Sequence, residues 1–208
     1  RLQVAYTDGQ GFAETVLATA VSIPNTPPSI LGIIVEGSQV FLQFSEAINT
    51  TGLTTSRFSA TVAGYPRGIA SVAPVSGDAS RLVLTLSTRI LLPAPTSRQT
   101  VAIAYTDLST ADDTSGVVQD AVGNDMATIS PPRNADTFSS ADTVTSLAST
   151  YTNLVLTGTS AINGTGNAGN NNITGNSAVN VITGDAGADT MNGGASGDIY
   201  LINSATDH

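Results

Sequence analysis

The side chains able to do chemistry in this chain of 208 residues are almost all carboxylates. Of its 16 acidic residues only Glu14, Glu36 and Glu46 are Glu, so 13 are Asp, and there is no Cys. The absence of Cys excludes disulfides, thiol catalysis and cysteine-ligated zinc. A single histidine, His208, excludes His-based catalytic triads and multi-histidine metal sites. The chemistry to look for is therefore ligation of a hard cation such as Ca2+ by oxygen.

Acid and amide side chains recur every nine residues in the C-terminal third. Read in nines from Gly166, the chain runs GNAGNNNIT, GNSAVNVIT, GDAGADTMN and GGASGDIYL. Each unit has Gly at position one, Asn or Asp at position six and a large apolar residue at position eight. Position six is filled by Asn171, Asn180, Asp189 and Asp198, and position eight by Ile173, Ile182, Met191 and Tyr200.

This pattern resembles the RTX-type, or hemolysin-type, calcium-binding nonapeptide repeats of secreted bacterial proteins, and the resemblance covers residues 139–208. It implies a parallel β-roll in which a turn of six residues precedes a strand of three and the position-eight side chain points inward. Successive units would lie on opposite sheets, so each unit would stack on the one two repeats away. Ca2+ would sit between stacked turns, held by turn carbonyls and position-six carboxylates, and the roll would fold with calcium.

The stacking rule pairs Asn171 with Asp189, Asn180 with Asp198, and Asp207 with Asp189. Each of the first two pairs has one carboxylate, so we expect between zero and about two Ca2+ ions, touching Asp189 and Asp198. An alternative is a roll whose early turns close with Asn ladders and water. Asp207 belongs to a fifth unit, 202–208, which has no glycine, so a full turn is not expected there. The candidate metal ligands are Asn171, Asn180, Asp185, Asp189, Asp198 and Asp207.

The RTX resemblance also implies a biological context. Such proteins leave the cell unfolded by type I secretion and fold outside it, where calcium is abundant. The implied location is secreted and extracellular, at the cell surface. The partners that we expect are calcium, cell-surface polysaccharide or neighbouring copies of the same protein.

Acidic residues also gather late in the first two-thirds of the chain. Two interpretations stay open for them: an inter-domain calcium site, or solvated carboxylates and Asx turns such as the one indicated by Asp120 and Gly123-Asn124. A pair of acids for glycoside hydrolysis is not supported, because nothing nearby resembles an aromatic sugar platform. We expect no enzyme activity. The residues concerned are Glu46, Asp107, Asp112, Asp113, Asp120 and Asp125.

The elements that would carry these loops are short β-strands. Apolar residues alternate with others around Val40–Phe44, Phe58–Val62, Leu82–Leu86 and Val101–Tyr105, and turn residues separate the runs. This predicts an all-β fold: an immunoglobulin-like β-sandwich followed by the parallel β-roll. The sequence VAYTD at residues 4–8 recurs as IAYTD at 103–107, one sandwich domain later.

The repeat predicts four segments. Residues 1–26 are the terminal strands of a truncated immunoglobulin-like repeat, and 27–132 form one sandwich. Residues 133–153 are a linker or irregular turns leading into the roll, and 154–208 form a truncated roll. The motifs TPPSILGIIVEGSQVFLQFSEAI, LVLTL and VVQDAVGND are similar to bacterial immunoglobulin-like tandem repeats of the long cyanobacterial, swimming-type surface proteins. That similarity implies a stalk or adhesin module.

Charge narrows the function classes. A net charge of −9 argues against nucleic acid and anionic membranes as partners, and no apolar run is long enough for a membrane span. The main hypothesis is a non-catalytic structural or adhesive fragment of a large secreted bacterial surface protein. The alternative is the non-catalytic, calcium-binding C-terminal region of a secreted hydrolase. A lesser alternative is a binder of ice or a polysaccharide surface, based on Thr165, Thr174 and Thr183.

Overall fold

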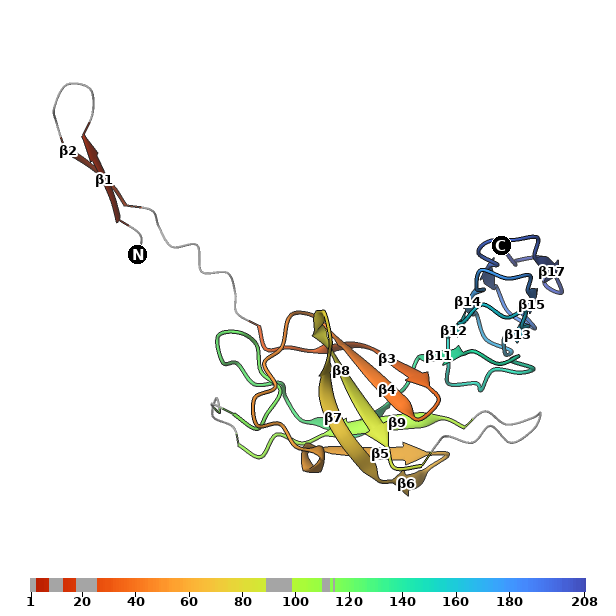
Figure 1. The fold of residues 1–208 in the computed structure, drawn as a ribbon, viewed down its shortest axis with the longest axis horizontal. Helices are drawn as coiled ribbons and strands as arrows, with labels where there is room; N and C mark the ends of the chain where they lie inside the picture. The colour runs from red at the N-terminus through yellow and green to blue at the C-terminus, as the bar shows by residue number, and fades with distance from the viewer. Residues whose placement is uncertain (1–2, 8–12, 18–25, 89–98, 110–112, 114) are drawn as a thin grey trace.

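The computed structural model describes residues 3–7, 13–17, 26–88, 99–109, 113 and 115–208, and it confirms an all-β fold (Figure 1). The described chain has strands and one short 3-10 turn, η1 (Thr55–Arg57). Among the described residues, no helix is long or apolar enough to cross a bilayer.

Two antiparallel sheets form the sandwich. One has the order β3-β4-β8-β7 and the other the order β10-β9-β5-β6. This is the ABED and GFC order of the immunoglobulin-type sandwich, with β6 as an extra edge strand. The strands of the first sheet are β3 (Ile30–Glu36), β4 (Gln39–Phe44), β7 (Ile69–Val75) and β8 (Asp78–Leu86). Those of the second are β5 (Phe58–Val62), β6 (Tyr65–Arg67), β9 (Val101–Tyr105) and β10 (Ile129–Asn134).

The alternation of apolar residues correctly predicted which side chains face the core. In β4, for example, Val40, Leu42 and Phe44 are buried, whereas the residues between them are partly exposed. The same alternation appears in β5, β8 and β9. Such period-two burial between facing sheets is how a sandwich removes apolar surface from water.

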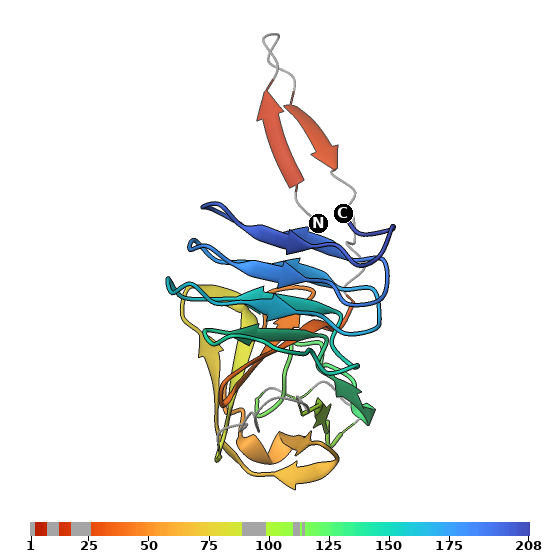
Figure 2. The same cartoon turned by 90° about the vertical axis from the view of Figure 1, so that its right-hand side faces the viewer.

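The roll consists of two parallel sheets joined by turns, and its coils stack one above another (Figure 2). Strands on one side are β11 (Thr137–Ser140), β12 (Asn153–Leu156), β14 (Asn172–Thr174) and β16 (Thr190–Asn192). Strands on the other are β13 (Gly164–Thr165), β15 (Val181–Thr183) and β17 (Ile199–Leu201). Ile173 pairs with Met191 and Ile182 with Tyr200, so units stack two repeats apart, as predicted.

The roll continues one sheet of the sandwich. β11 pairs in parallel with β3 through Thr137–Ile34, Phe138–Val35 and Ser139–Glu36, which makes an eight-stranded sheet from β7 to β16. The segment 133–153 therefore includes the end of β10 and all of β11. The buried apolar core likewise extends without a break from the sandwich through Phe138 and Tyr151 into the roll.

The N-terminal segment is described only in part. β1 (Gln3–Thr7) and β2 (Ala13–Leu17) pair antiparallel in a sheet of their own. Residues 8–12 and 18–25 lie outside the described residues, and with them Asp8 of the repeated VAYTD motif. The assignment of residues 1–26 to a preceding repeat stays a prediction.

Candidate metal centre in the β-roll

The position-six side chains form two columns in which each contacts the unit below it. Asp189 Oδ1 accepts a hydrogen bond from the backbone N–H of Asn171 at 2.7 Å, and Asp198 Oδ1 accepts one from Asn180 at 2.8 Å. Asp207 Oδ1 accepts one from Asp189 at 3.3 Å. The structure therefore brings together all three pairs that the stacking rule named.

The glycine at position one is required by the position-six oxygen of the same unit. A Cβ on Gly184 would lie 2.3 Å from Asp189 Oδ2, and one on Gly193 would lie 2.2 Å from Asp198 Oδ2. At Gly166 the same point is approached by Asn171 Oδ1 at 2.4 Å and by the carbonyl oxygen of Gly184 at 2.3 Å. Each missing side chain thus leaves room for a cluster of oxygen atoms between stacked turns.

Asp189 has an electrostatically unfavourable position in this stack, because its carboxylate is fully buried. Its Oδ2 atom has no hydrogen-bond partner. Burial raises the pKa of Asp189 above its ordinary value, and the Asp207 and Asp185 carboxylates add to the increase, although the hydrogen bond from Asn171 opposes it. A buried, unpaired carboxylate oxygen beside other acids is stabilised strongly by a cation.

The fifth unit differs from expectation. Despite having no glycine, it forms a turn over Asp189: Asp207 Oδ2 accepts a hydrogen bond from Ser204 N–H at 3.1 Å, and His208 N–H donates to Asp189 O at 2.7 Å. The Ser204 hydroxyl also pairs with the Thr206 hydroxyl at 2.7 Å. Hydrogen bonds from short polar side chains therefore close this turn, which has no glycine.

Asn167 and Asn176 were missed as site residues. They occupy position two of the first two units, and their side-chain amides bridge stacked turns. The recurrence of Gly-Asn at positions one and two, nine residues apart, is the signal that could have identified them.

The position-eight residues fill the interior with one exception. Ile173 and Ile182 are fully buried and Met191 is nearly so, but Tyr200 in the last strand of the stack is 42% exposed. Tyr200 stacks on Ile182 as predicted but is not covered on its other side by a described coil, and its hydroxyl accepts a hydrogen bond from Gly193 N–H at 2.7 Å.

The threonines do not make a flat array. Thr165 pairs with Thr183 in one sheet, where the column continues with Leu201, and Thr174 lies in the other sheet between Val155 and Asn192.

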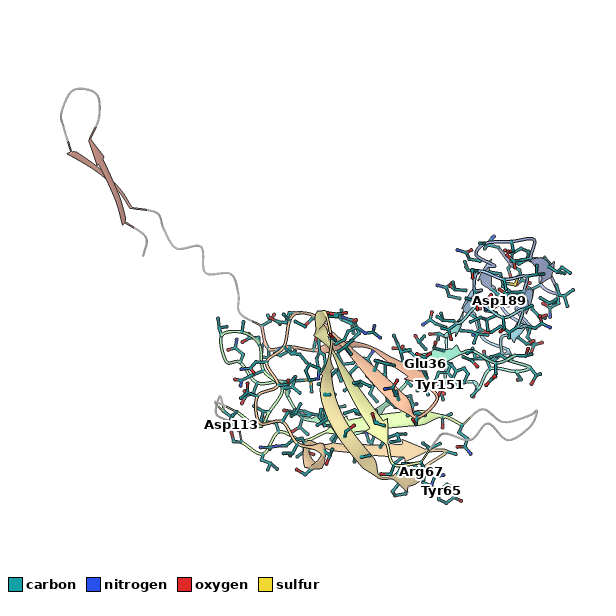
Figure 3. The ribbon with its side chains drawn as sticks, in the orientation of Figure 1. Glu36, Tyr65, Arg67, Asp113, Tyr151 and Asp189 are labelled. Atoms are coloured by element: carbon teal, nitrogen blue, oxygen red, sulfur yellow. The ribbon has the colours of Figure 1, made fainter. Side chains whose placement is uncertain are left out.

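The acids of the sandwich divide into two groups. Asp107, Asp113 and Asp125 bring carboxylate oxygens within 4.8 Å of one another, and Asp113 lies at the end of the sandwich away from Asp189 and the roll (Figure 3). Asp120 instead closes an Asx turn, because its Oδ1 accepts hydrogen bonds from Val122 and Asn124 N–H groups, both at 2.9 Å. Burial acts to raise the pKa of Asp120, but these turn hydrogen bonds lower it overall.

Two other acids considered in the sequence do not join these groups. Glu46 is not part of the three-carboxylate cluster, and Asp112 lies outside the described residues.

Comparison with known families classifies the roll. Residues 165–200 match the RTX calcium-binding nonapeptide repeat in four copies. This segment is therefore similar to RTX-type repeats, and Ca2+ is the ion that such repeats bind. The match covers the roll and not the sandwich, and the relation of the sandwich to immunoglobulin-like tandem repeats remains a prediction.

Comparison with whole proteins adds little. No match was found among curated proteins. Solved structures of the bacterial S-layer protein SbsC resemble part of the chain with a TM-score of 0.40. Its N-terminal part is 15% identical over 54% of this chain and 23% of that chain; the structure of rSbsC(31-844) is 13% identical over 54% and 13%. The chain spans less than a quarter of the length of these structures.

The residues present fit calcium. Asn171 Oδ1 and the Gly184 carbonyl oxygen approach the same point, the Cβ position of Gly166, at 2.4 and 2.3 Å, and the unpaired Oδ2 of Asp189 lies 2.3 Å from the Cβ position of Gly184. Neutral and charged oxygens in a flexible arrangement are the ligands that Ca2+ prefers. The RTX-type turns of the roll would hold the ion there, and it would neutralise the buried charge of Asp189.

Proposed function

We propose that the chain is a non-catalytic structural module of a large secreted bacterial surface protein, in which Ca2+ orders the RTX-type roll. The observation that carries this proposal is the buried Asp189 carboxylate, with Oδ2 unpaired and two further acids close by. Nothing else in the described roll compensates that charge, because the segment after residue 133 has no Lys or Arg. A divalent cation is the component that the described fold needs.

The joint between sandwich and roll supports a structural role. The two parts share one sheet, and Asp136 fastens the joint: its carboxylate accepts from the backbone N–H of Ile33 and from the hydroxyl of Thr137 at 2.9 Å. Arg133 forms an ion pair with Asp136 at 3.5 Å and donates to the carbonyls of Ile30 and Leu31. A module joined in this way holds its roll at a fixed orientation, as a stalk or adhesin requires.

Calcium binding is tested by calorimetric titration of the whole chain, with Asp189→Asn as the test variant and Asp78→Asn as the matched control. Asp78 lies in the sandwich, where its Oδ1 accepts from Ser80, a role that an amide oxygen keeps. We expect the control to bind Ca2+ like the parent chain and Asp189→Asn to bind at least tenfold more weakly. Equal binding by all three, or none by the parent, would refute the proposal.

Surface location and partners need separate experiments. Antibodies against the sandwich should label intact, non-permeabilised cells that produce the protein. Sedimentation with and without Ca2+ tests association between copies, and a polysaccharide array tests binding to cell-surface glycans. Labelling only after cell lysis would contradict the assignment to the surface.

A further inference from the structure

The first two turns of the roll are bridged by asparagine amides. In one column, Asn167 Nδ2 donates to the carbonyl oxygens of Ala148 and Tyr151, both at 2.9 Å. Its Oδ1 accepts from the N–H of Gly169 at 2.8 Å. Asn171 Nδ2 makes a longer contact, 3.4 Å, with the same Tyr151 carbonyl. The carbonyls of the turn before residue 166 therefore already have donors.

The second column repeats this arrangement with different residues. Asn176 Nδ2 donates to the carbonyl oxygens of Thr157 at 3.2 Å and Ser160 at 2.9 Å, and its Oδ1 accepts from Ala178 N–H at 2.9 Å. Asn180 Nδ2 donates to the Ile162 carbonyl at 2.6 Å. Four amides in two columns thus occupy the places between turns where a cation would otherwise meet carbonyl oxygens.

The orientation of these amides is fixed by their neighbours. An amide oxygen and nitrogen are distinguished by what each faces. Asn167 Oδ1 and Asn176 Oδ1 each accept a backbone N–H of their own turn, which an NH2 group could not do. Their Nδ2 atoms must therefore face the carbonyls of the turn below, and a cation placed there would be repelled by the N–H dipoles.

The backbone conformation also differs between the first two turns and the acidic turns that follow them. Positions two and four have positive φ angles in the third and fourth units, at Asp185 (73°), Gly187 (127°), Gly194 (89°) and Ser196 (79°). The corresponding residues of the first two units do not. The early turns are therefore built differently and closed by their own side chains.

The early and the late turns of the roll also differ in their charged residues. No charged residue lies between Asp142 and Asp185, whereas Asp185, Asp189, Asp198 and Asp207 follow in quick succession. The self-closed turns are neutral and lie next to the sandwich, whose β3 strand pairs with β11. The acidic turns lie at the far end of the roll (Figures 2 and 3).

We propose that the roll is divided along its length: the asparagine-bridged turns fold without calcium as a permanent extension of the sandwich, and Ca2+ orders only the acidic turns from residue 184 onward. The first part is a preformed template, since a solenoid unit needs a neighbour on which to stack. This inference rests on the proposed calcium function and specifies where along the roll that function acts.

Hydrogen exchange of the whole chain, read by mass spectrometry in Ca2+ and in chelator, tests the division. We expect protection of residues 153–170 to be unchanged by the chelator and protection of 184–208 to fall at least tenfold. Residues 171–183 are left out of the comparison, because the N–H groups of Asn171, Gly175 and Asn180 donate to the acidic units. Loss of protection along the whole roll would overturn the division and leave calcium-dependent folding intact. No change in either region would overturn both, because the acidic turns would then not need calcium.

A second test changes the amides themselves. Asn167→Asp or Asn176→Asp keeps the side-chain shape but turns an oxygen toward two carbonyl oxygens, so we expect the Tm in chelator to fall by about 5 °C. Calcium should restore most of that loss, because the new carboxylate makes the gap a cation site. Asn172→Asp is the matched control, since Asn172 is exposed in β14. Equal Tm values for control and test variants in chelator would overturn the role of the amides.

Discussion

Replacement of Gly175 by Ala tests the geometry of the stacked turns most directly. A Cβ at this position would lie 2.2 Å from the Gly193 carbonyl oxygen and 2.5 Å from Asn180 Oδ1, closer than the 3.0 Å that real Cβ atoms respect. The nearest obstacle is backbone of the next coil, which must move by about 1 Å. Overpacking of this kind costs about 1–3 kcal/mol, and we expect the upper part of that range because a carbonyl is displaced rather than a flexible side chain.

The control is Gly197→Ala, because a Cβ on Gly197 would meet no atom within 4 Å. Both variants change the unfolded chain in the same way, so the difference between them reports the folded stack. At 2–4 °C per kcal/mol for a chain of this size, Gly175→Ala should lower the Tm by about 6–12 °C relative to the control. Circular dichroism in calcium-containing buffer measures it. If the two variants melt together, the tight stacking described for position one is wrong.

Three further predictions concern the core and the joint. Tyr105→Phe removes the hydroxyl that accepts the buried Val118 N–H at 2.9 Å, so denaturant unfolding should show a loss of about 1–3 kcal/mol, whereas Tyr65→Phe, at an exposed position, should show none. Ile182→Ala should cost about 2–5 kcal/mol through the cavity that it opens inside the roll, and a loss below 1 kcal/mol would mean that the roll collapses around it. Asp136→Ala removes the acceptor for a β3 N–H, so amide exchange in β11 should accelerate at least tenfold while exchange in β8 stays unchanged.

Most of the fold could be predicted from the periodicity of the sequence. Strand alternation identified the inward residues of β4, β5, β8 and β9, and the nine-residue frame identified the stacking of Asp189 on Asn171. Both patterns arise because burial repeats at the period of the backbone, so a single sequence records them. The position-one glycines were predicted as turn residues, and the structure adds the oxygen atom that each one accommodates.

The joint could not be predicted in the same way. The pairing of β11 with β3 joins residues about a hundred positions apart and involves three residue pairs whose contacts are backbone hydrogen bonds. Backbone hydrogen bonds do not depend on which side chains are present. The alternation of apolar residues in β3 would therefore be the same whether its edge were free or paired. The burial of Tyr200 likewise depends on whether a neighbouring coil packs on it, which the residue type does not reveal.

Asn171 explains why calcium and asparagine bridging are not competing descriptions of one site. Its Nδ2 atom faces the Tyr151 carbonyl of the coil below, and its backbone N–H faces Asp189 of the coil above. Its Oδ1 atom accepts from Asn167 N–H at 2.7 Å and borders the space above Gly166 that the Gly184 carbonyl also enters. An Asp at this position could ligate a cation above, but it would turn an oxygen toward the carbonyl below. Asn is the residue that satisfies both sides, so Asn171 closes the self-closed turn below it and borders the first calcium-dependent turn of its column, which begins at residue 184.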